Sequence, residues 1–124
     1  MNEKLLDAAR KSTLNKWSPP YKKVFECANP LCGDVVKLTY CEEKKSFILF
    51  FEGCLLVKVS SLILERELSK STPEKVHAEF IIQYNAKLFT GDYSILNEGM
   101  QIPGRSKCIE LPWNSLKEYL SVNR

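Results

Sequence analysis

The sequence has little of what usually gives a small protein a quick functional assignment. It contains one histidine, His77, and no Cys-x-x-Cys pair in 124 residues. A zinc ribbon is therefore excluded, and a hydrolytic zinc enzyme has no histidine or glutamate base placed near a ligand set. The longest apolar stretches, such as 47–51 and 62–64, are far too short to cross a bilayer. We therefore expect no membrane association.

Charge is also unremarkable. The chain carries 18 basic and 15 acidic side chains, a net charge of +3, spread along its length without an aromatic-studded basic block. This distribution gives no support for nucleic-acid binding. The first residues, Met1–Lys4, lead into an amphipathic pattern and not a signal-peptide core, which predicts a cytoplasmic location. There, five cysteines are expected as thiols or ligands and not as disulfides.

Length and hydrophobic pattern predict one domain over residues 1–124 of the α+β class, a small antiparallel β-sheet packed against several α-helices. Two strands are expected, over 35–42 and 46–52, joined by a polar hairpin connection. The helical pattern predicts helices over 2–16, from about 54 to 69, from 73 to about 88, and in a last stretch that ends near residue 122. Pro112 lies in that last stretch, so we expect the helix to start late or to kink.

Three cysteines and an aspartate stand in settings that favour metal binding. Cys32 and Asp34 lie in the turn-forming segment Asn29-Pro30-Leu31-Cys32-Gly33-Asp34, Cys54 follows Gly53, and Cys108 follows Arg105-Ser106-Lys107. Thiolates are soft donors, and a carboxylate adds a harder oxygen. Three thiolates and one carboxylate fill a tetrahedral zinc site, or hold a small iron–sulfur cluster with one replaceable ligand.

The predicted helices place Cys54 and Cys108 at or near helix N-termini. Free backbone N–H groups there favour a thiolate, so we expect lowered thiol pKa values, and Lys107 adds a positive charge beside Cys108. Cys32 lies on a loop whose glycine and proline let the backbone approach an ion. Spacing alone, with steps of 22 and 54 residues between the cysteines, leaves open both a shared metal site and unrelated thiols.

Together these segments resemble the U-type iron–sulfur cluster scaffold family, which includes the NifU N-terminal domain, IscU and SufU. Family members carry an Asn-Pro-x-Cys-Gly-Asp loop, a Gly-Cys at a helix start, and an Arg-x-x-Cys before a terminal helix with Leu-x-Trp. This chain has these motifs in the same order, at 29–34, 53–54, 105–108 and 111–113. It departs from the family in having one glycine before Cys54 where Gly-x-Gly is usual.

The resemblance implies that Cys32, Asp34, Cys54 and Cys108 bind zinc, iron or a transient [2Fe–2S] cluster. Lys107 stands where IscU-type members have histidine, and no Leu-Pro-Pro-Val-Lys segment occurs in 96–102. Both features resemble the SufU-type branch.

By the same resemblance, a cysteine desulfurase of the SufS, IscS or NifS kind would deliver sulfur to Cys32, with Cys108 as second candidate and Lys107 tuning it. Apo iron–sulfur proteins would receive the cluster. The chain would then be a non-enzymatic scaffold, or alternatively a zinc-dependent sulfurtransferase.

A different class remains open: a structural zinc-binding interaction module without sulfur chemistry. A closed structural site usually lacks aspartate, which makes Asp34 the discriminating residue. The remaining candidates have plainer interpretations. Cys27 and Cys41 match no motif and are expected to be structural thiols. His77 is expected to pack or face solvent, and Trp113 to anchor the core.

Overall fold

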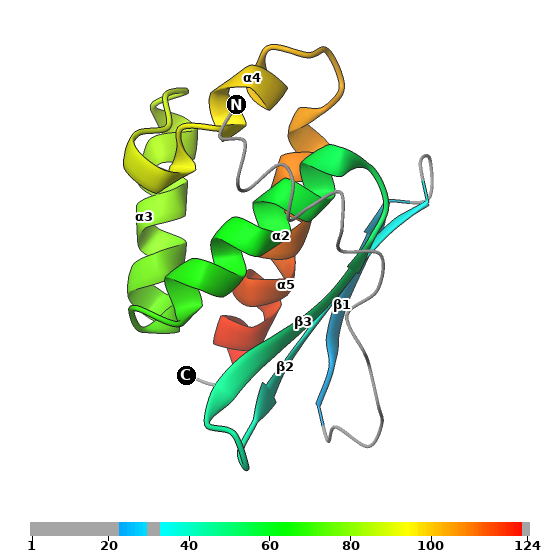
Figure 1. The fold of residues 1–124 in the computed structure, drawn as a ribbon, viewed down its shortest axis with the longest axis vertical. Coiled ribbons are helices and arrows are strands. Elements are labelled where there is room, and N and C mark those ends of the chain that lie inside the picture. The colour runs from blue at the N-terminus through cyan, green and yellow to red at the C-terminus, as the bar shows by residue number, and fades with distance from the viewer. Residues whose placement is uncertain (1–22, 30–32, 123–124) are drawn as a thin grey trace.

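A computed structural model describes residues 23–29 and 33–122, and Figure 1 shows its architecture. The helix expected over 2–16 lies outside the described residues. The described elements, in order, are β1 (Phe25–Asn29), β2 (Asp34–Cys41), β3 (Ser46–Glu52), α2 (Leu55–Leu68), α3 (Pro73–Asn85), the 3₁₀ turn η1 (Gly91–Tyr93), α4 (Leu96–Met100) and α5 (Ser106–Val122). Within this part of the chain, no helix has the length and apolar character needed to span a membrane.

The strands form one antiparallel sheet in the order β1-β2-β3. The register pairs Asn29 with Asp34 across the first connection and Cys41 with Ser46 across the second. The second connection is the predicted hairpin at 42–45. The strand β1 was not predicted, because it has only five residues and ends at the turn motif.

The helices cover one face of the sheet in layers (Figure 1). Helix α2 packs on β3, and α5 packs on β1 and β2, while α3 contacts the two helices and lies beyond them. Together these elements give an α+β fold with a small antiparallel sheet, as predicted.

The predicted helix starts are confirmed at α2 and α3. Cys54 is the N-cap of α2, and Thr72 caps α3 by accepting a hydrogen bond from the Lys75 N–H, with Pro73 in the first turn. Helix α3 ends at Asn85, three residues before the predicted boundary, because Lys87 adopts a positive φ of 58°.

The expected late start of the last helix is wrong. Helix α5 begins at Ser106 and runs through Pro112. Proline removes only its own N–H, which would have bonded the carbonyl of Cys108, and the buried face on both sides of Pro112 holds the helix together.

That face centres on Trp113, which is 1% exposed and lies stacked on the Phe80 ring at 4.2 Å between centroids. The indole Nε1 donates to Ser60 Oγ at 2.8 Å, and Ser60 Oγ donates to the Ile109 carbonyl at 2.7 Å. This buried chain of hydrogen bonds ties α2 to the first half of α5 and confirms Trp113 as a core anchor.

Candidate metal centre

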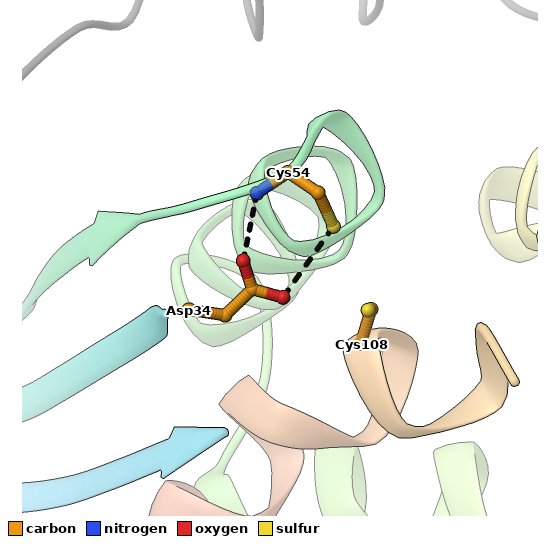
Figure 2. Close-up of side chains that lie close together, drawn as sticks. All are labelled: Asp34, Cys54 and Cys108. Atoms are coloured by element: carbon orange, nitrogen blue, oxygen red, sulfur yellow. Dashed lines mark hydrogen bonds between the residues drawn. The ribbon is translucent and has the colours of Figure 1, made fainter. Parts of the chain in front are cut away.

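Three candidate ligands meet where β2, α2 and α5 begin. Asp34 starts β2, Cys54 precedes α2, and Cys108 is the third residue of α5. One ligand atom from each residue lies within 4.8 Å of the other two. Figure 2 shows the Asp34 carboxylate and the sulfurs of Cys54 and Cys108 close together at the starts of the two helices. Asp34 and Cys54 are 20 positions apart in the chain, and Cys54 and Cys108 are 54 positions apart. The fold thus brings together three residues that are distant in the sequence.

The Asp34 carboxylate is held in place by Cys54. Oδ1 accepts the Cys54 backbone N–H at 2.8 Å, and the Cys54 thiol donates to Oδ2 at 3.5 Å (Figure 2). Asp34 is 1% exposed, so these contacts replace water around a buried carboxylate. The N-cap residue Cys54 makes no side-chain cap hydrogen bond, and the first turn of α2 holds no acid. Asp34, which lies on another element, therefore satisfies one of the free N–H groups at the start of α2, that of the N-cap residue itself.

Gly53 makes this approach possible. A Cβ at this position would lie 2.0 Å from Asp34 Oδ1, and the φ of Gly53 is +143°. Both the close approach and the backbone conformation require glycine. The family pattern has two glycines before this cysteine and the chain has one. That one, Gly53, is the glycine that the contact with Asp34 requires.

Cys108 is buried in the first turn of α5, with 2% of its surface exposed. Burial raises the pKa of its thiol to about 12, helped by hydrogen bonds with Cys54 and Asp34, while a hydrogen bond from Arg105 opposes the rise. The expected lowering of this pKa is therefore wrong for the metal-free protein: desolvation outweighs the helix N-terminus.

The basic side chain that acts on Cys108 is Arg105. From the sequence, Lys107 was expected to tune Cys108 because it is adjacent. Lys107 and Arg105 are both exposed, and the role of Lys107 stays a prediction. The spacing along a helix could have identified Arg105. A residue three positions before Cys108 lies about one helical turn away on the same face, whereas an adjacent residue points in another direction.

The fourth candidate, Cys32, lies outside the described residues, and its place in the site stays a prediction. Among the described residues that flank it, the Gly33 N–H donates to the Asn29 carbonyl at 2.9 Å. Gly33 has a φ of +73°, which glycine adopts without strain.

The other candidate side chains do not join the cluster. Cys27 is half-buried in β1, where burial raises its thiol pKa, and Cys41 is buried at the end of β2. His77 lies in α3, where burial and nearby Lys117 lower its pKa. Within 23–29 and 33–122, the Asp34–Cys54–Cys108 group is the one cluster of potential metal ligands.

The donor set fits a metal ion. Two thiols and a carboxylate within bonding reach of one point suit zinc or iron, and the buried carboxylate already has its Oδ1 occupied by a backbone N–H. Oδ2 is therefore the oxygen of Asp34 available to an ion. The set has no imidazole, in keeping with a chain whose one histidine is in α3.

Comparisons with known proteins support one class. The chain is 35% identical over 101 residues to the iron–sulfur cluster assembly scaffold protein IscU of Streptococcus pyogenes, which covers 73% of this chain and 64% of that protein. The chain thus matches slightly under two thirds of this relative's length. No protein-family model matches the chain.

Two solved structures share the fold. A protein of Fervidobacterium islandicum, assigned as an iron–sulfur cluster assembly scaffold of the SUF system, has a TM-score of 0.73 at 22% identity, over 95% of this chain and 94% of that one. The N-terminal part of a NifU-like protein of Brucella abortus has a TM-score of 0.76 at 17% identity, over 97% and 91%. The chain therefore shares the fold of these two proteins. Together these comparisons support the U-type family that includes IscU, SufU and NifU.

Proposed function

We propose that this protein assembles iron–sulfur clusters, with sulfur supplied by a cysteine desulfurase of the SufS, IscS or NifS kind. The observation that carries the proposal is the convergence of Asp34, Cys54 and Cys108 from three separate elements. The similarity to IscU supports an iron–sulfur cluster as the cargo, and the three residues offer the ligands to hold it. Cys32 completes the proposed set of four.

In the scaffold role, three thiolates and one carboxylate hold a transient [2Fe–2S] cluster as substrate. Thiolate ligands bind the cluster irons firmly, and the harder carboxylate of Asp34 is the ligand most easily replaced. A cluster with one replaceable ligand can be passed to an apo-protein, whose own thiolate takes the vacated position. Apo iron–sulfur proteins are therefore the proposed recipients.

Sulfur transfer is the second part of the proposal. The Cys32 thiolate attacks the outer sulfur of a persulfide on the desulfurase, and a new S–S bond forms on Cys32. The bond between the donor cysteine and that outer sulfur breaks, and the donor sulfur leaves with the electron pair as a thiolate. The exchange needs no oxidant or reductant, and the sequence makes Cys108 the second acceptor.

We also propose that the same residues bind zinc when no cluster is present. Zinc, when bound, would keep the thiols deprotonated and protected from oxidation. Asp34 is then the residue that yields first, because a single carboxylate oxygen binds zinc less durably than a thiolate. Its release would free a position for an incoming ligand.

Reconstitution with iron and sulfide tests the scaffold role. We expect the purified protein to develop the visible absorption of an iron–sulfur cluster, and Cys108→Ser to lose it. Cys27→Ser is the control, since Cys27 is a half-buried thiol that lies outside the cluster of ligands. Equal reconstitution of Cys108→Ser and the wild type would overturn the proposed site.

Desulfurase stimulation tests the sulfur-acceptor role. The wild type should increase sulfide release by a cysteine desulfurase, and Cys32→Ala should not. If Cys32→Ala stimulates equally, Cys32 is not the acceptor. A protein that holds one zinc, resists reconstitution and stimulates no desulfurase would instead be the structural zinc module.

A further inference from the structure

Helix α4 lies at the end of the molecule where the two ligand-bearing helices begin (Figure 1). It contacts both α2 and α5, although it is only five residues long. Its fourth residue, Gly99, is buried. The short helix thus fills the space between the first turns of α2 and α5.

A side chain at position 99 would fit only if the ends of two neighbouring side chains moved. A Cβ built there would lie 2.7 Å from Leu56 Cδ2, 3.2 Å from Leu56 Cδ1 and 3.0 Å from Ile109 Cδ1. Ordinary contacts between carbon atoms are about 3.5–4.0 Å. The φ of Gly99 is outside the left-handed region, so packing and not backbone conformation demands the glycine.

The two side chains in contact with Gly99 adjoin two of the candidate ligands. Leu56 lies two residues after Cys54, and Ile109 directly follows Cys108. Both are buried, with 8% and 0% of their surfaces exposed, so neither can turn away without disturbing its neighbours. A larger residue at position 99 would therefore push the first turns of α2 and α5 apart.

We propose that Gly99 is a positioning residue for the metal centre, and that its missing side chain sets the separation of Cys54 and Cys108. The inference rests on the proposed metal site. Zinc–sulfur bonds have a length near 2.3 Å, and ligand distances in zinc sites stay within about 0.2 Å of the standard values. A shift of a few tenths of an ångström in either turn consequently weakens binding.

Cobalt(II) titration of Gly99→Ala tests this proposal. Cobalt bound by thiolates absorbs visibly, and competition with a chromogenic chelator gives the affinity. We expect Gly99→Ala to bind about tenfold more weakly, as for other changes outside the ligand set, with altered bands. Val76→Ala is the control for general destabilisation, since Val76 is buried in α3, which carries no candidate ligand. It should bind like the wild type.

A second substitution checks the cause. Leu56→Val removes both Leu56 atoms that the new Cβ would meet. The double variant Gly99→Ala/Leu56→Val should therefore bind cobalt with the affinity of Leu56→Val alone. The two affinities should agree to within about threefold, or about 0.7 kcal/mol. If Gly99→Ala alone does not fold, the double variant must fold and bind as Leu56→Val does. A double variant that stays unfolded or binds weakly overturns the proposal.

The outcomes separate this inference from the proposed function. If Gly99→Ala binds cobalt with wild-type affinity and bands, Gly99 does not position the ligands, and the metal centre stands. If the wild type binds no cobalt, the metal centre itself is wrong.

Discussion

Asp34 Oδ1 accepts the backbone N–H of Cys54 at 2.8 Å, so a candidate ligand on β2 is also the cap of α2. The other oxygen, Oδ2, lies 3.5 Å from Cys54 Sγ. One carboxylate therefore does two things: it holds the helix that carries Cys54, and it presents an oxygen beside the two sulfurs. These two roles can be separated by mutation.

Asp34→Asn and Asp34→Ala should differ in the stability of the metal-free protein. Asparagine keeps an oxygen that accepts the Cys54 N–H, whereas alanine leaves that buried donor without a partner. We expect Asp34→Ala to lose about 1–2 kcal/mol of unfolding free energy and Asp34→Asn clearly less, measured by urea denaturation with a chelator present. Both should weaken metal binding, because neither keeps the anionic oxygen. Equal stability of Asp34→Ala and the wild type would refute the capping role.

Gly53→Ala should damage both fold and site. The added Cβ would meet Asp34 Oδ1 at 2.0 Å, at a φ of +143° that side chains rarely adopt. We expect a loss of about 1–3 kcal/mol or more in unfolding free energy, and weaker metal binding. Gly91→Ala is the control: its φ is also positive, at +59°, but nothing lies within 4 Å of its added Cβ. Normal metal affinity in Gly53→Ala would contradict the account of this position.

Metal uptake should release a proton from Cys108. Its thiol pKa is about 12 in the metal-free protein, so at pH 7 the thiol holds its proton, and a metal binds only the thiolate. Apparent affinity should therefore rise with pH and fall on acidification. Calorimetry in buffers of different ionisation enthalpy counts the protons released, and Cys108→Ser should release about one fewer. An unchanged proton count in that variant would show that Cys108 is not a ligand.

Ser60→Ala should loosen the packing of α2 against α5. The hydroxyl of Ser60 accepts from Trp113 Nε1 and donates to the Ile109 carbonyl, all in the buried core. Its removal leaves a buried indole N–H unpaired, at a cost of about 1–3 kcal/mol in unfolding free energy. Ser121→Ala removes a hydrogen bond from an exposed serine to Glu118 and should change stability by less than about 0.5 kcal/mol. Similar effects of the two substitutions would contradict the structural role of Ser60.

Asp34→Cys distinguishes a site that exchanges ligands from a closed structural one. A thiolate at position 34, in place of the carboxylate, should preserve or strengthen zinc binding. Sulfur transfer and cluster release should be lost if they depend on a yielding carboxylate. Desulfurase stimulation that persists in a zinc-loaded Asp34→Cys protein would show that ligand exchange at Asp34 is not required.

Much of the fold was predictable because its longest elements have strong local signals. The β-branched and aromatic residues of β2 and β3, the Thr72-Pro73 start of α3 and the Gly53 break before α2 are all visible in the sequence. Strand β1 and helix α4 were not predicted, because each has five residues and is held by its neighbours. Such short elements carry too few residues to show a period.

The site was predictable in its residues and less so in its physics. Motifs named Asp34, Cys54 and Cys108, and the structure brings them together. The raised pKa of Cys108 depends on burial, which local sequence does not show, so helix position alone gave the wrong direction. The contact of Gly53 with Asp34 is likewise tertiary, and so is the packing of Gly99 against Leu56.

X-ray absorption at the zinc edge of the zinc-loaded protein examines the proposed ligand set most directly, Cys32 included. We predict one zinc per chain, bound by three sulfurs at about 2.3 Å and one oxygen at about 2.0–2.2 Å, with one sulfur fewer in Cys32→Ser. A shell of nitrogen and oxygen alone, or three sulfurs retained in Cys32→Ser, would contradict it.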